Sequence, residues 1–156
     1  MSSKTFILKT LDESDIEDLY KMNQEIFKEE IVYDKPYLER FCKLKQGFIL
    51  KNDKSPIGYV IFGMTYCGAN RQFTIISIGV SSAFRGKGYG KMLLQAVLDK
   101  FPSREISLHV RVQNKIAQKL YKSVGFEIID IEEGYYHQLN DDAYHMTKPL
   151  NHMKSL

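Results

Sequence analysis

The sequence predicts an α/β (α+β) fold in which a central sheet of about seven strands carries helices on both faces. Strand-like and helix-like segments alternate along the chain. One crossover unit is predicted near the middle of the chain. It consists of a strand at residues 73–80, a glycine loop at residues 86–90, a helix, and a parallel strand at residues 106–112. The chain has 156 residues and is 44% hydrophobic, which suffices for one core. We therefore expect a single domain over residues 1–150 and a short tail over residues 151–156.

Each strand is predicted from an apolar or β-branched run that turn residues interrupt. The expected strands are residues 6–9, 47–51, 57–66, 73–80, 106–112, 126–131 and 143–147. Helices are predicted where apolar residues recur at three- and four-residue intervals. The expected helices are residues 16–27, 36–44, 92–101 and 114–124. Ser14 and Glu17 have the spacing of a capping box, which predicts Ser14 as the N-cap of the first helix.

Composition restricts the location of the protein and the kind of site. No apolar run approaches the ~20 residues that a membrane-spanning helix needs, and the first residues lack the apolar core of a secretory leader. We therefore expect a cytoplasmic protein, or one that also enters the nucleus, without a membrane partner. Cys42 and Cys67 are isolated, and the four histidines lack the spacing of metal ligands. The sequence thus predicts reduced thiols and no metal site.

Positive charge is concentrated in one part of the chain. Residues 84–123 contain nine lysines and arginines but two acidic residues, although the whole chain carries a net charge of only +3. This segment predicts an anionic ligand, while the acidic remainder suits a cationic one. Nucleic acid is disfavoured as a partner, because the aromatic residues of the segment are not interleaved with its basic residues as in a stacking platform.

The glycine loop between the fourth strand and the third helix predicts the anion more closely. Gly86, Gly88 and Gly90 let backbone N–H groups converge on a phosphate at a helix N-terminus, and Arg85, Lys87 and Lys91 add full charges. The pattern is not a Walker loop, because Met92 follows Gly90-Lys91 and the glycine spacing is one residue short. A Rossmann fingerprint lacks its third glycine here. The loop therefore predicts binding of a diphosphate group.

Two motifs resemble the GNAT family of acetyltransferases. Arg85-x-x-Gly88-x-Gly90 resembles the pyrophosphate loop of that family. Its downstream pattern, Asn-x-x-Ala-x-x-Leu-Tyr-x-x-x-Gly-Phe, is matched by Asn114, Ala117, Leu120, Tyr121, Gly125 and Phe126. The resemblance implies the GNAT fold, a mixed and mostly antiparallel sheet splayed between its fourth and fifth strands, with acetyl-CoA as the cofactor. It assigns coenzyme A contacts to Ile78, Gly79, Val80, Arg85, Gly86, Lys87, Gly88, Tyr89, Gly90, Lys91, Asn114 and Tyr121.

Other residues are similar to the protein Nα-acetyltransferases of this family, of the San type and of the ribosomal-protein-alanine type. The resemblance makes His109 a general base and Tyr121 a donor of a proton to the leaving thiolate. Substrate contacts are expected at Phe27, Tyr33, Tyr135 and Tyr136. The San-type enzyme has a second, tyrosine base where this chain has Thr74, whose hydroxyl is no base near neutral pH. Residues 28–32 replace a Pro-Val pair and are more acidic, which predicts a preference for a basic residue near the acceptor amine.

Three functions remain open at this level. The first is transfer of an acetyl group to the α-amino group of a protein N-terminus, with an auxiliary subunit as a further expected partner. The second is transfer to a lysine side chain or to a small amine such as a polyamine, which the acidic stretches Glu29-Glu30 and Asp130 to Glu133 would attract. The third is a non-catalytic module that binds acyl-CoA or docks onto another acetyltransferase.

Overall fold

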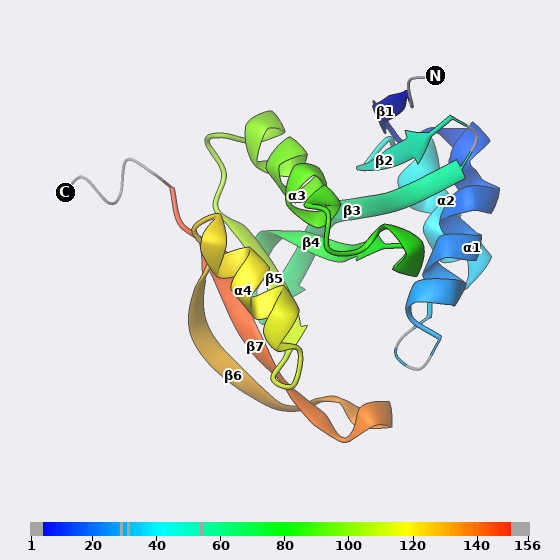
Figure 1. Ribbon diagram of the computed structural model, residues 1–156. Helices are drawn as coiled ribbons and strands as arrows, with labels where there is room; N and C mark the ends of the chain where they lie inside the picture. The colour runs from blue at the N-terminus through cyan, green and yellow to red at the C-terminus, as the bar shows by residue number, and fades with distance from the viewer. Residues whose placement is uncertain (1–4, 29, 31, 54, 151–156) are drawn as a thin grey trace. The chain divides into compact units, whose positions relative to one another are not determined.

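The computed structural model describes residues 5–28, 30, 32–53 and 55–150 of the chain (Figure 1). The expected tail at residues 151–156 lies outside the described residues. The described part contains seven strands and four α-helices. In chain order they are β1 (Phe6–Thr10), α1 (Ile16–Ile26), α2 (Lys35–Lys43), β2 (Gly47–Asn52), β3 (Ser55–Cys67), β4 (Asn70–Val80), α3 (Tyr89–Lys100), β5 (Ile106–Arg111), α4 (Lys115–Ser123), β6 (Glu127–Tyr136) and β7 (Asp141–Lys148).

The strands form a seven-stranded sheet in the order β1-β2-β3-β4-β5-β7-β6. The predicted number of strands is thus confirmed. The parallel crossover that the glycine loop predicted joins β4 to β5, and its register comprises the pairs Phe73–Ile106 and Thr74–Ser107. A register this short, at the start of β5, agrees with the expected divergence of these two strands. The pairs β1–β2, β2–β3, β5–β7 and β6–β7 are antiparallel.

Several predicted boundaries shift. The last hairpin is longer than expected, since β6 runs to Tyr136 and β7 begins at Asp141. β6 is a strand at the sheet edge with mostly exposed side chains, so it accepts its acidic residues without burying charge. No helix of the described residues has the length and apolar character needed to cross a membrane.

The chain divides into two compact units. The first contains the chain up to Phe62 together with Ile76–Asp99, and the second contains Gly63–Ile75 together with the chain from Lys100 onward. Strands β3 and β4 contribute residues to both units.

In the first unit, helices cover opposite faces of β2 and β3. The core cluster under α1 and α2 contains Ile49 of β2 with Tyr59 and Ile61 of β3. Gly58, which points to the other face because side chains alternate along a strand, meets α3 instead. A Cβ atom at Gly58 would lie 2.7 Å from the Gly79 carbonyl oxygen of β4 and 3.0 Å from Leu93 Cδ1 of α3. The expectation of helices on both faces is confirmed here, and the close approach of the β4 backbone requires glycine at position 58.

The start of α1 corrects a sequence prediction. Asp12, rather than Ser14, is the capping residue: its carboxylate accepts the Ser14 N–H at 2.9 Å, and the Asp12 N–H donates to the Asp15 carboxylate at 3.0 Å. The capping box therefore surrounds a short 3-10 turn, Glu13–Asp15, that precedes α1. The prediction was wrong because a 3-10 turn precedes α1, so the N–H groups that need a cap come earlier in the chain, where the Asp12 carboxylate accepts that of Ser14.

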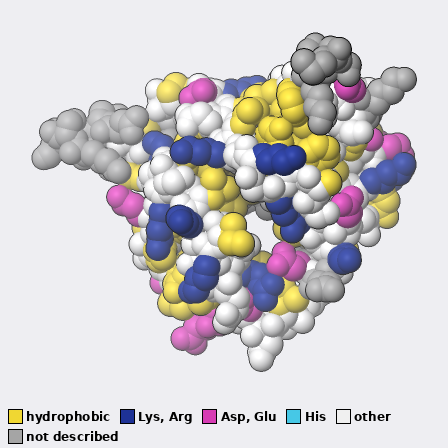
Figure 2. Space-filling view, viewed as in Figure 1, with side chains coloured by type: hydrophobic (Ala, Val, Ile, Leu, Met, Phe, Trp, Pro, Cys, Tyr) yellow, Lys and Arg dark blue, Asp and Glu magenta, His cyan; other side chains and the backbone are white. Residues whose placement is uncertain are grey.

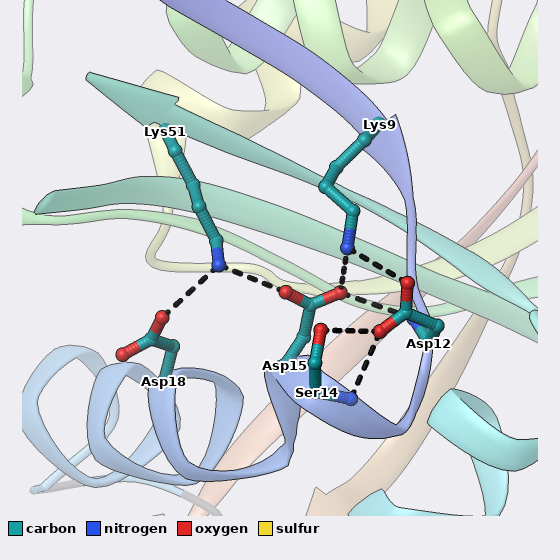
Figure 3. A network of polar contacts seen from close by, with 6 residues as sticks. All are labelled: Lys9, Asp12, Ser14, Asp15, Asp18 and Lys51. Atoms are coloured by element: carbon teal, nitrogen blue, oxygen red, sulfur yellow. Dashed lines mark hydrogen bonds and ion pairs between the residues drawn. The ribbon is translucent and has the colours of Figure 1, made fainter. Parts of the chain in front are cut away.

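Asp15 also joins α1 to the sheet (Figure 3). Its fully buried carboxylate forms ion pairs with Lys9 of β1 and, at 2.9 Å, with Lys51 of β2. Lys51 reaches Asp18 of α1 as well, at 3.2 Å. A buried carboxylate is stable only when it is paired, so this network fixes the beginning of α1 against two neighbouring strands.

In the second unit, β7 lies between β5 and β6. Leu108 and Val110 of β5 and Met146 of β7 are buried on one face of these strands. The helix α4 is attached to the end of β5 by Gln118, whose Nε2 donates to the carbonyls of Arg111 and Val112 at 3.0 and 2.8 Å. The opposite face of β5 carries the polar side chains of His109 and Arg111.

Candidate active site

The glycine loop occupies the turn between β4 and α3 in the first unit, as predicted. Its course is fixed at the start by the Ser81 N–H, which donates to the Ile57 carbonyl at 2.8 Å. Gly86 and Gly88 have φ angles of 78° and 85°, in the left-handed region that side chains disfavour. A Cβ atom at either glycine would meet no atom within 4 Å, so these residues are glycine because of the backbone conformation and not because of crowding.

The loop has the parts of an anion site. The first N–H groups of an α-helix have no acceptor in a preceding turn, and α3 begins at Tyr89 directly after Gly88. Arg85, Lys87 and Lys91 are exposed around it. Arg85 is partly anchored, since its Nε donates to the Val80 carbonyl at 3.1 Å. The residues present therefore fit a diphosphate such as that of coenzyme A, and open space outside the two glycines leaves room for it.

Tyr89 has a packing role in addition to its place at the helix start. Its ring lies 5.5 Å from the ring of Phe6 and 6.4 Å from that of Phe84. The side chain thus packs α3 and the preceding turn against β1. Of Tyr89, only the backbone N–H is then proposed to contact an anion.

The end of β4, predicted to bind the pantetheine arm, lies beside Phe27 in the same unit. Ile78 and Val80 are half-buried and Gly79 is buried. A Cβ atom at Gly79 would lie 3.0 Å from Ile26 Cδ1 and 3.2 Å from Phe27 Cε2. Glycine at this position lets the end of α1 rest on the strand, and it brings a predicted substrate residue next to a predicted cofactor residue.

Tyr33 is held by a buried hydrogen-bond network that the sequence did not reveal. Its backbone N–H donates to Asn23 Oδ1 at 2.9 Å, and Asn23 Nδ2 donates to the Tyr59 hydroxyl at 3.0 Å. The Tyr59 hydroxyl is 2.8 Å from the Ser77 hydroxyl on β4. The chain segment with Tyr33 is therefore tied to β4 at Ser77, the residue before Ile78. Residues 29 and 31 of the predicted acidic substrate loop lie outside the described residues.

His109 stands in a cluster on β5, β6 and β7 in the second unit. Its Nε2 is 2.9 Å from Glu132 Oε1. Its ring is stacked on both sides, against Tyr135 at 4.4 Å and 6° and against His145 at 4.8 Å and 12°. Tyr136 meets the Tyr135 ring edge-on at 5.0 Å. The predicted base and the predicted pair of substrate tyrosines are thus brought together.

Strand register explains this cluster. His109 is directly opposite His145 in the β5–β7 pair, and Glu132 is opposite Ala143 in the β6–β7 pair. Opposed residues share a face of the sheet, as do residues two apart on one strand, so all three polar side chains lie on one face. Sequence reasoning missed Glu132 and His145, because neither the pairing of non-consecutive strands nor their register can be read from spacing.

The electrostatics of the cluster depend on burial. His145 is 7% exposed, and burial, followed by the charge of His109, lowers its pKa. Its Nε2 is buried and has no hydrogen-bond partner among the described residues. Glu132, by contrast, keeps 34% of its side chain exposed. The cluster therefore contains one carboxylate that is accessible to solvent and two stacked imidazoles that are more buried.

The two predicted residues of the α4 motif have different surroundings. Asn114 is the N-cap of α4, and its Oδ1 accepts the Ala117 N–H at 3.1 Å. Tyr121 is buried against Phe126, with ring centroids 6.0 Å apart, and burial raises the pKa of its phenol well above the usual value. Exposed lysines of α4, which are Lys115, Lys119 and Lys122, contribute to the basic side chains that gather over this helix (Figure 2).

Comparison with known proteins decides the family. The model of the acetyltransferase (GNAT) family matches residues 15–126, which include the glycine loop and the α4 motif. The chain belongs to the GNAT family. An N-alpha-acetyltransferase of Sulfolobus acidocaldarius is 31% identical to it over 150 residues, 88% of each chain. Arabidopsis thaliana Naa50, in complex with the bisubstrate analogue CoA-Ac-MVNAL, has a TM-score of 0.80 at 26% identity and covers 92% of this chain and 98% of its own.

Other GNAT relatives match over shorter stretches. The [ribosomal protein bS18]-alanine N-acetyltransferase of Haemophilus ducreyi is 47% identical over 66 residues, which cover 40% of this chain and 46% of that protein. The chain spans between 26% and 49% of the length of this relative and of two further curated ones.

Thr74 on β4 is the residue that the San-type resemblance matches with a tyrosine base. Its hydroxyl is 2.5 Å from the Thr65 hydroxyl and 3.0 Å from the Ser107 hydroxyl. Thr74 and Ser107 are both buried, at 6% and 2% exposure. The threonine is thus the centre of an internal hydroxyl chain between β3, β4 and β5, and it has a structural partner on either side.

Proposed function

We propose that this GNAT chain transfers the acetyl group of acetyl-CoA to the α-amino group of a protein N-terminus. The proposal depends on the placement of His109, which is hydrogen-bonded to Glu132 and stacked on Tyr135. Relatives that match most of the chain are named N-alpha-acetyltransferases, and the Naa50 structure holds an analogue that joins coenzyme A, an acetyl group and a peptide beginning Met-Val. Both facts support an N-terminal acceptor.

The acidity of the acceptor favours a histidine base. A protein N-terminus has a reference pKa of ~7.7–8.0, whereas a lysine side chain has ~10.4, and an imidazole has ~6.5. An imidazole can therefore take the proton of an α-amine near neutral pH far more easily than that of a lysine. In this scheme the Glu132 carboxylate sets the orientation and tautomer of the His109 ring. The Tyr135 ring covers one face of it and restricts its motion.

The remaining groups serve the acetyl donor. Acetyl-CoA supplies an activated acyl group as a thioester. The loop amides and the side chains of Arg85, Lys87 and Lys91 would bind its diphosphate. Tyr121 is the proposed donor of a proton to the departing thiolate, as in the family resemblance. Burial raises the pKa of its phenol, which keeps the proton in place and makes the phenol a weaker acid than an exposed tyrosine.

Cofactor binding is tested by reversing one charge of the loop. Arg85→Glu should weaken binding of acetyl-CoA, measured by calorimetry, roughly ten- to a hundredfold, because a charged hydrogen bond contributes about 1.5–3 kcal/mol. Arg40→Glu on α2 is the matched control, since it makes the same substitution at an exposed position of the same unit. Equal affinities in the two variants would contradict the assignment of the loop.

The acceptor and the base are tested together. Peptides with a free N-terminus and an internal lysine should gain one acetyl group at the first residue, located by mass spectrometry, whereas polyamines and N-terminally blocked peptides should not react. His109→Ala should lower kcat ~10²–10⁴-fold, the usual contribution of a general base. His137→Ala, at the exposed turn after β6, is the control. Acetylation of blocked peptides would favour the lysine alternative, and an unchanged kcat would remove His109 from the mechanism.

A further inference from the structure

Three possible metal ligands converge at the His109 cluster. His109, Glu132 and His145 each offer one ligand atom, and these atoms all lie within 4.8 Å of one another. The residues come from three neighbouring strands, β5, β6 and β7, and share one sheet face. Two imidazoles with one carboxylate form a donor set that suits zinc and related transition metals, whereas Mg²⁺ and Ca²⁺ prefer oxygen ligands alone.

A second observation points to a ligand at this place. His145 is nine-tenths buried, yet its Nε2 has no partner in the part of the chain that the structure describes. An unsatisfied buried polar atom costs about 1–3 kcal/mol and usually has an explanation. The hydrogen bond between His109 and Glu132 satisfies those two residues but leaves His145 without one. A cation bound by all three residues would satisfy the whole cluster.

We propose that His109, Glu132 and His145 form a binding site for a single divalent transition-metal ion of the zinc type. Bonds of ~2.0–2.2 Å to a tetrahedral ion place ligand atoms about 3.3 Å apart, so ligand atoms as much as 4.8 Å apart must close by up to about 1.5 Å. The pair His109 Nε2 and Glu132 Oε1, at 2.9 Å, needs no closing. The 34% exposure of Glu132 gives the ion a route from solvent. A water molecule or an amine would take the fourth position.

The site has a consequence that rests on the proposed function. A neutral imidazole has one nitrogen with a free lone pair, and coordination of a metal uses it. Metal-bound His109 therefore cannot accept the proton of an amine. Binding of the ion and catalysis by His109 exclude each other, which makes the site inhibitory and makes the acetyl transfer sensitive to free zinc.

Binding is measured on untagged, chelator-treated protein, with Zn²⁺ followed by calorimetry and Co²⁺ by its visible absorption. The wild type should bind one ion per chain and give the intense absorption of tetrahedral cobalt. Glu132→Gln and His145→Gln should each weaken binding of Zn²⁺ at least tenfold and abolish that absorption. Glu133→Gln and His137→Gln are matched controls from the same hairpin, and they should bind as the wild type does.

A third measurement guards against variants that fail to fold. In the wild type, addition of Zn²⁺ should shift the imidazole resonances of His109 and His145 but not those of His137. The proposal is overturned if no ion binds, if all four variants bind equally, or if the resonances of His109 and His145 stay in place. Acetylation by the chelator-treated wild type is assayed separately. If the chelator-treated wild type binds zinc but does not acetylate peptides, the proposed function alone is refuted. If it acetylates peptides but binds no zinc, the metal site alone is refuted.

Discussion

A single hydroxyl at position 74 illustrates how one residue changes the expected chemistry. Thr74 hydrogen-bonds to Thr65 and Ser107, within a unit that also contains His109. A threonine hydroxyl does not lose its proton near neutral pH, so the proposed function has one base rather than two. The structure gives Thr74 a role in internal hydrogen bonding, and in the proposed function His109 with its carboxylate partner is then the base.

Removal of this hydroxyl should affect stability and spare catalysis. Thr74→Val leaves the hydroxyls of half-buried Thr65 and buried Ser107 without their shared partner, which should lower the free energy of unfolding by about 1–3 kcal/mol. Denaturant titration measures this loss, and thiol release from acetyl-CoA should show kcat within a few-fold of the wild type. Thr74→Ser, which keeps a hydroxyl, is the control. A hundredfold fall of kcat in folded Thr74→Val protein would show that the hydroxyl takes part in the reaction.

At the scale of elements, the first helix is held to the sheet by charge as well as by its apolar face. Burial opposes ionisation of Asp15, but hydrogen bonds from Lys9 and Lys51 outweigh it and lower its pKa. Hydrogen bonds from the Ser14 hydroxyl and N–H, with one from Lys9, lower the pKa of Asp12 to about 2. The two carboxylates are therefore more acidic in the folded chain than in the unfolded chain, where the value is 3.8.

This difference predicts acid sensitivity. A depressed folded pKa stabilises the fold above the unfolded value, and the contribution is lost as the pH falls below 3.8 toward about 2. Asp15→Asn should lower the free energy of unfolding at neutral pH by about 1.5–3 kcal/mol and make its decline at acid pH shallower. Denaturant titrations over this pH range measure both effects. Glu25→Gln, an exposed carboxylate of α1, should behave as the wild type. A decline as steep as that of the wild type in Asp15→Asn would contradict the assignment.

At the scale of the whole molecule, charge is divided unevenly along the chain. Nine lysines and arginines between Phe84 and Ser123 belong to the glycine loop, α3, β5 and α4 and the turns between them, while acidic residues prevail elsewhere. A concentration of one charge raises the local concentration of an oppositely charged ligand. Coenzyme A is such an anion, and the segment includes both motifs of the GNAT pattern.

The affinity for acetyl-CoA should therefore depend on salt. Raising the ionic strength from about 0.05 to about 0.5 M shortens the screening length to a few ångströms and should weaken binding several-fold in calorimetry. The dependence should be smaller in Arg85→Glu, because one attractive charge of the loop is reversed. An affinity that does not change with salt would mean that the basic segment contributes little to capture of the cofactor.

The family, the seven strands and the glycine loop could be predicted from the sequence because each depends on local order along the chain. Strand and helix periodicity, the φ angles that favour Gly86 and Gly88, and the spacing of the α4 motif are all properties of short segments. The spacing argument that predicted no metal ligands is local in the same way. It therefore does not address a site built from separate strands, such as the one that we propose at His109, Glu132 and His145.

Only the tertiary structure decided which polar side chains meet. Glu132 and His145 join His109 because β7 is inserted between β5 and β6 with one particular register, and a shift by one residue would turn them to the other face. Asn23, Tyr59 and Ser77 likewise come together from α1, β3 and β4. Contacts of this kind depend on the pairing of distant segments, which the order of residues along the chain does not display.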